Sequence, residues 1–156
     1  MESAIRDYVL LSSAHSMEVS LETIKYGKAG LNPHRRMLLA RVPKTNDWAK
    51  FERDSISMRD IAYLSAKTDD EFTILRGKKE DILFHGSKYH CDIEGVLFDM
   101  LIEGKLELYG HSHPIERIPI PSDDDRNTLT LIGQRKSRII SAITGKEITY
   151  GASRYE

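Results

Sequence analysis

The stretch His111-Ser112-His113-Pro114 carries the residues best suited to chemistry in this chain of 156 residues. Residues 106 to 113 alternate like a half-buried strand, so His111 and His113 are expected to project from the same face. Side chains two positions apart on a strand are close enough to bind one metal ion, and Pro114 ends the strand because it has no N–H to donate. The alternation assigns Leu106, Leu108 and Ser112 to one face and Tyr109, His111 and His113 to the other.

An acidic cluster, Ser122-Asp123-Asp124-Asp125, follows the two histidines after a short loop. One of its carboxylates is a candidate third metal ligand. A serine followed by three aspartates also favours the start of a helix, because the hydroxyl caps free N–H groups and the acids complement the positive end of the dipole. The two interpretations are compatible, since a helix N-terminus can hold one aspartate rigidly while its side chain turns to the metal.

The order of these motifs resembles the JAB/MPN/Mov34 metalloprotease family, also called JAMM. The signature of that family is a distant Glu, then His-Ser/Thr-His-Pro, then a loop that ends in Ser-x-x-Asp, and the resemblance covers about residues 68 to 150. Asp125 keeps the Ser-x-x-Asp spacing from Ser122, whereas Asp124 keeps the family's usual separation from the second histidine. Asp125 is preferred as the ligand, and Asp124 stays as its competitor.

The resemblance implies a fold and a role for each site residue. The fold would be α/β (α+β), of the cytidine-deaminase-like/MPN type, with a mixed central sheet flanked by helices. A Zn²⁺ ion would be held by His111, His113 and Asp125, with water in the fourth position. Ser122 would stabilise the oxyanion that forms when the water attacks a carbonyl. Ser112, on the other strand face, is expected to be a structural hydrogen bonder.

Glu71 is the candidate catalytic base, because the JAMM glutamate stands at or near the start of a strand that precedes the central helix. Residues 71 to 85 are predicted to form a β-hairpin that begins at Glu71. Without the downstream motif, an acid at a strand start is ordinarily just solvated. Glu80 lies in the hairpin turn and Glu107 lies roughly 13 Å from His111 along the strand, so both fit the role less well.

The family implies a zinc-dependent metallopeptidase or isopeptidase acting on a protein or peptide substrate, often one with a ubiquitin-like modifier. The sequence looks most like bacterial JAB-type proteins, which include domains of polymorphic toxins and of phage or defence systems. Two alternatives stay open: a non-catalytic MPN-like interaction module, and another metal-dependent hydrolase such as a PHP-type phosphoesterase. Activity on a generic aryl phosphate would favour the latter.

Composition excludes several other classes of protein. The 23 basic and 24 acidic residues are intermixed and nearly balance, so no nucleic acid or anionic membrane is expected as a partner. Cys91 is the only cysteine, which rules out an internal disulfide and a thiolate zinc cage. The N-terminus has no secretory apolar region, so a cytoplasmic location is expected, with non-classical export left open. The sequence gives no oligomeric state.

The elements that position the motifs follow from periodicity and capping residues. Residues 1–55 are interpreted as a helical and irregular N-terminal extension and 56–156 as the metalloprotease core, together one compact domain. The N-terminal part is predicted to contain a helix within 1–30, with Ser16 as its N-cap and His15 as a surface or capping residue, and an irregular stretch over 31–50 whose Met37–Val42 run is a strand or packed arm. The core is predicted to begin with a helix from Ser57 to near Thr68 and the 71–85 hairpin. A helix capped at Gly104, the histidine strand, a helix from Ser122 to Gly133, and paired strands over 138–144 and 147–150 follow; the apolar stripe of the first of these helices is Ile93, Val96, Leu97, Met100 and Leu101.

Overall fold

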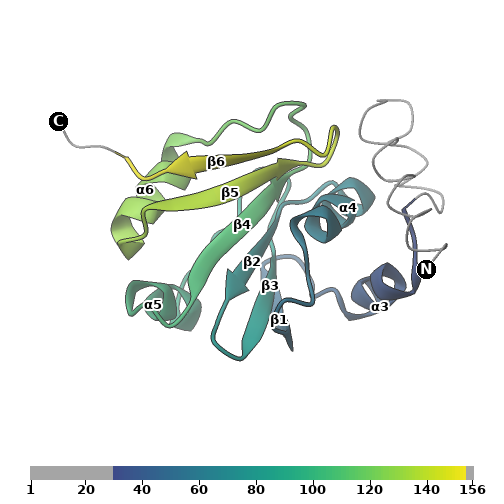
Figure 1. The fold of residues 1–156 in the computed structure, drawn as a ribbon, viewed down its shortest axis with the longest axis horizontal. Coiled ribbons are helices and arrows are strands. Elements are labelled where there is room, and N and C mark those ends of the chain that lie inside the picture. The colour runs from purple at the N-terminus through teal and green to yellow at the C-terminus, as the bar shows by residue number, and fades with distance from the viewer. Residues whose placement is uncertain (1–29, 154–156) are drawn as a thin grey trace.

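The computed structural model describes residues 30–153, which form a six-stranded sheet with helices on both faces (Figure 1). The helix predicted within 1–30, with His15, lies outside the described residues except for Gly30. Within 30–153, no helix is long and apolar enough to cross a membrane. The helices are α3 (Pro33–Arg41), α4 (Met58–Thr68), α5 (Val96–Ile102) and α6 (Asp123–Ile132); the strands are β1 (Asp47–Glu52), β2 (Phe72–Arg76), β3 (Glu80–His85), β4 (Glu107–His113), β5 (Lys136–Ser141) and β6 (Glu147–Gly151).

The sheet has the strand order β1-β3-β2-β4-β5-β6. Every neighbouring pair is antiparallel except β4 and β5, which are parallel. The predicted mixed α/β architecture, the 71–85 hairpin and the closing strand pair are therefore confirmed. The order also places the histidine strand β4 beside β2, the strand that Glu71 precedes, in the middle of the sheet.

Two apolar cores lie on opposite faces of the sheet, because successive strand residues point to opposite sides. Leu83 of β3 joins the core beneath α3 and α4, while its neighbours Ile82 and Phe84 join the core beneath α5 and α6. Figure 1 shows α4 on one face and the α5–α6 pair on the other. The sheet that carries the histidines is thus buried on both sides over its central strands, which makes it a rigid base for a site.

Truncation of Leu64, which is fully buried in the core beneath α4, is predicted to destabilise the protein. Leu64→Ala should lower the free energy of unfolding by about 2–5 kcal/mol, because it removes apolar contacts and leaves a cavity. Urea unfolding followed by circular dichroism measures this loss. Ile102→Ala is the control, since Ile102 is 52% exposed; a loss there as large as at Leu64 would contradict the assigned core.

Paired side-chain and backbone hydrogen bonds begin the two helices that the sequence marks with a serine. Ser57 and Asp60 form a capping box at the start of α4, and Ser122 and Asp125 form another at the start of α6. Gly133 then ends α6 in the left-handed conformation, with φ of 72°. The predicted helix starts at Ser57 and Ser122 are confirmed, and the second one fixes Asp125 in space.

The prediction of an irregular stretch over 31–50 is wrong, as is the strand alternative for Met37–Val42. The structure has helix α3 there, started by Asn32, whose side chain accepts a hydrogen bond from the backbone N–H of Arg35, and by Pro33 in the first turn. Strand β1 follows and pairs with β3 at the edge of the sheet. Both elements lie within the predicted extension, and both join the core or the sheet described above.

Two details of the histidine strand and its preceding helix also differ from expectation. The β2–β4 register shifts so that Ile74 pairs with Gly110 and Leu75 with Leu108, which leaves Tyr109 in a bulge. Tyr109 therefore packs in the α4 core, away from the histidines, and Leu106 and Leu108 lie on the opposite side, in the α5–α6 core. Helix α5 begins only after Gly95, whose φ of 68° is not helical; consequently Ile93 precedes the helix and Val96 is exposed.

Candidate metal centre

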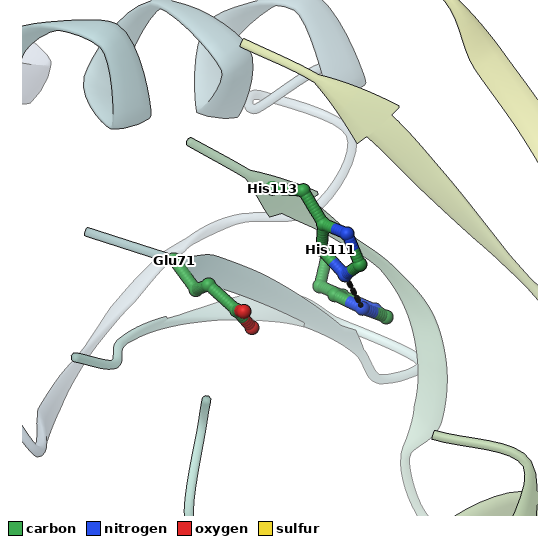
Figure 2. A group of neighbouring side chains, drawn as sticks. All are labelled: Glu71, His111 and His113. Carbon is green, nitrogen blue, oxygen red and sulfur yellow. Dashed lines mark hydrogen bonds between the residues drawn. The ribbon is translucent and has the colours of Figure 1, made fainter. Parts of the chain in front are cut away.

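Three elements bring four acid and imidazole groups together. Strand β4 supplies His111 and His113 on one face, Glu71 stands directly before β2, and Asp125 lies in the first turn of α6. Figure 2 shows the Glu71 carboxylate directed toward the two imidazoles, which approach each other. Both histidines and Glu71 are buried, with exposures of 5–7%.

The two imidazoles converge on one point. Nε2 of His111 lies 3.0 Å from Nε2 of His113. Two nitrogens bound to one tetrahedral zinc, each at about 2.0–2.1 Å, stand roughly 3.3 Å apart, so the rings are already close to that geometry. One potential ligand atom from each of Glu71, His111 and His113 lies within 4.8 Å of the others. This buried cluster could hold a metal ion.

Asp125, rather than Asp124, faces the histidines. Its Oδ1 lies 3.5 Å from Nε2 of His111 and its Oδ2 lies 3.7 Å from Nε2 of His113. Oδ2 also accepts a 2.9 Å hydrogen bond from the backbone N–H of Ser122, so the capping box aims this carboxylate. Asp124 is exposed, and its backbone oxygen accepts a hydrogen bond from the hydroxyl of Thr128.

The charges of the centre act in opposite directions on its two acids. Burial raises the pKa of Glu71 to about 8, with Asp125 and Glu116 adding to the shift and His113 opposing it. Burial also disfavours the charged form of Asp125, but hydrogen bonds to His111 and His113 hold its pKa well below its ordinary range. Without a metal, the surroundings therefore favour the charged form of Asp125 and the protonated form of Glu71.

The two serines of the motifs have different surroundings. Ser122 is exposed, and its hydroxyl accepts a 3.0 Å hydrogen bond from the backbone N–H of Asp125, which leaves its own hydrogen free to donate. Ser112 is fully buried, and its hydroxyl accepts a 3.0 Å hydrogen bond from the backbone N–H of Phe72. Ser112 thereby ties β4 to the start of β2, next to Glu71, as its predicted structural role requires.

The cluster opens into a cavity of about 550 Å³. Asp125, Asp124 and Ser122 line it together with Glu71 and the histidines. Its lining is mixed: exposed polar residues such as Lys88, His90 and Asp124 lie among four exposed large hydrophobic side chains. These are Tyr89, Ile115, Ile120 and Leu131.

Sequence reasoning missed two residues that contact the histidines. Tyr150 of β6 lies edge-on to the ring of His111, with ring centroids 6.0 Å apart. Glu116 follows the motif in the loop, and its Oε2 lies 3.4 Å from Nδ1 of His113. A carboxylate three residues after a candidate ligand is a signal that the sequence does contain, whereas the approach of Tyr150 depends on the pairing of β5 with β6 and has no local signal.

Comparison with protein-family models, curated proteins and solved structures found no match to the chain.

Proposed function

We propose that the chain is a zinc-dependent metallopeptidase or isopeptidase of the JAMM type, built on the cytidine-deaminase-like/MPN fold. The observation that carries the proposal is a buried cluster of Glu71, His111 and His113 in an open cavity, with the Asp125 carboxylate approaching the same two imidazoles. The His-Ser-His-Pro and Ser-x-x-Asp motifs supply three of these four groups, and Glu71 supplies the other.

His111, His113 and Asp125 would hold the ion, since three protein ligands and an open fourth position are typical of catalytic zinc. When bound, zinc would act as a Lewis acid and lower the pKa of a coordinated water to about 7. Glu71 would accept the proton of that water as it attacks a carbonyl carbon. The Ser122 hydroxyl would donate a hydrogen bond to the developing oxyanion.

The pKa directions support this division of roles over the reverse one. A ligand to a cation is best ionised, and the pKa of Asp125 is lowered by the histidines beside it. A general base works best with a pKa near the working pH, and the pKa of Glu71 is raised to about 8 in the absence of an ion. A bound cation would lower the pKa of Glu71 from about 8 toward neutral pH.

The rim of the cavity supports a protein or peptide as the substrate. Several exposed apolar side chains at one concave site favour a role in binding another protein. Tyr89, Ile115, Ile120 and Leu131 are each 46–67% exposed there. A segment of extended chain with apolar side chains beside the scissile bond would bury them. A ubiquitin-like protein joined through its C-terminus is one substrate of this kind.

Metal analysis and a hydrolysis assay test the proposal together. Protein purified without added metal should contain about one zinc ion per chain. It should cleave members of a panel of quenched fluorescent peptides and ubiquitin-like fusions, lose that activity with a chelator and regain it with zinc. A protein that binds no zinc even when zinc is supplied would contradict the proposal and direct the search to binding partners.

The choice between the two aspartates gives a separate prediction. Asp125→Asn should weaken zinc binding by more than the 10- to 100-fold typical of changes to residues that hydrogen-bond a ligand, because an amide is a poor zinc ligand. Asp124→Asn should bind zinc like the wild type. Asn keeps an oxygen that can accept the capping hydrogen bond from Ser122, so helix α6 should persist in both variants. Zinc titration against a chromogenic chelator measures the difference, and a larger loss at Asp124 would reverse the assignment.

A further inference from the structure

The second nitrogen of the His113 ring has no hydrogen bond within residues 30–153. Nδ1 of His113 is buried from solvent and forms no hydrogen bond with the described residues. Nε2 of the same ring faces His111 at 3.0 Å and Asp125 at 3.7 Å. Leaving a buried polar nitrogen unsatisfied is costly, so this position calls for a hydrogen-bond partner.

The carboxylate of Glu116 is held beside this nitrogen. Its Oε2 lies 3.4 Å from Nδ1 of His113, slightly beyond the usual 2.7–3.2 Å range of an N–H···O hydrogen bond. The same oxygen accepts a 3.1 Å hydrogen bond from the backbone N–H of Ile120, which folds the loop back on itself. The hydroxyl of Ser141 on β5 donates to the backbone oxygen of Glu116. A small rotation of either side chain would complete the bond to His113.

We propose that Glu116 is a positioning residue of the metal centre. It accepts a hydrogen bond from the Nδ1–H of His113 and thereby leaves the lone pair of Nε2 free to bind the metal. This inference rests on the proposed function, since it assumes an ion at Nε2. A neutral imidazole carries one N–H, and the acceptor beside it decides which nitrogen keeps the hydrogen. An ionised carboxylate can only accept, so Glu116 favours the tautomer whose Nε2 lone pair faces the other ligands.

The position of Glu116 argues against its being a ligand itself. Glu116 lies at Nδ1, whereas His111 and Asp125 lie at Nε2, on the other side of the ring. An ion shared by the two histidines through Nε2 is therefore separated from Glu116 by the imidazole. Through Ile120, the same carboxylate also shapes the loop that leads to Ser122, so one side chain influences both the ring and the approach of the acidic cluster.

Zinc affinity separates this role from a merely structural one. Glu116→Ala should weaken zinc binding about 10- to 100-fold, as measured by competition with a chromogenic chelator. Glu116→Gln should lose less, because its amide oxygen still accepts a hydrogen bond. If the alanine variant does not fold, the glutamine variant, which has the same shape, decides by a measurable loss of affinity. Thr144→Val is the control: it removes the 2.6 Å hydrogen bond from Thr144 to the backbone oxygen of Arg117 and perturbs the same loop without touching the carboxylate.

A second readout reports the hydrogen bond directly. Long-range ¹H–¹⁵N spectra of the zinc-loaded wild type should show both imidazoles of the centre with hydrogen on Nδ1. The His113 resonance should move upfield in Glu116→Gln, because an amide oxygen is a weaker acceptor than a carboxylate. An unshifted resonance would overturn the role.

Three outcomes on affinity decide the matter. Weakened binding in Glu116→Ala with near-wild-type binding in Thr144→Val supports the proposal. Wild-type affinity in Glu116→Ala, or an equal loss in Thr144→Val, overturns it while the metal centre stands. A wild type that binds no zinc overturns the proposed function and this inference with it, so the two failures are distinguishable.

Discussion

Glu71→Gln should lower the rate of hydrolysis about 10²- to 10⁴-fold while the protein keeps its zinc. The glutamine side chain has nearly the same size as the glutamate but cannot accept a proton at neutral pH. The buried position of Glu71, beside the histidines and at the edge of the cavity, makes it the group placed to take a proton from an attacking water. The measurement is kcat on a cleaved peptide, with zinc content determined on the same sample.

Glu80 and Glu107 supply matched controls for this change, since both are glutamates on the same sheet. Glu80 forms an exposed ion pair with Lys50, and Glu107 is exposed at the start of β4. Their Gln variants should hydrolyse substrate at close to the wild-type rate. If Glu71→Gln loses zinc instead of activity alone, Glu71 is a ligand, and the roles proposed for it and for Asp125 are reversed.

The parts of the fold that the sequence predicts well are those fixed by local signals. The capping boxes at Ser57 and Ser122 set the starts of α4 and α6 through contacts between residues three apart. The 71–85 hairpin likewise depends on neighbouring residues and a short turn. A local contact also distinguishes Asp125 from Asp124: the capping box with Ser122 holds the Asp125 carboxylate beside His111.

The parts that could not be predicted depend on contacts between distant segments. The bulge at Tyr109 arises where β4 pairs with β2, so simple alternation assigns Leu108 to the wrong face while the histidines, which lie beyond the bulge, keep their common one. Tyr109 instead lies between the guanidinium groups of Arg76 and Arg138, from the strands on either side. Helix α3 was a different case: its Asn32-Pro33 start is a local signal that the apolar run after it obscured.

The His111→Ala/His113→Ala double variant should lose the ion altogether, because it removes two of the three ligands proposed here. Zinc content should fall from about one per chain to background. A ligand that binds only the folded state stabilises it by about 2.7 kcal/mol at a free concentration 100 times Kd, so zinc should raise the Tm of the wild type and a chelator should reverse the rise. The double variant should melt at the same temperature with zinc or chelator, which separates loss of the ion from the ordinary cost of truncating two buried rings.

His90→Ala is the control for this experiment, since His90 lines the same cavity but is exposed and stands outside the ligand cluster. It should retain both the zinc and the zinc-dependent rise in Tm. If the double variant retained the ion, the two imidazoles would not be ligands. The 3.0 Å separation of their Nε2 atoms on β4 would then have no explanation in metal binding. In the absence of a metal, that contact requires one ring to give a hydrogen and the other to accept it, so at least one of the two is neutral. A cation there would bind both lone pairs at once, and the ionised Asp125 beside them would balance its charge.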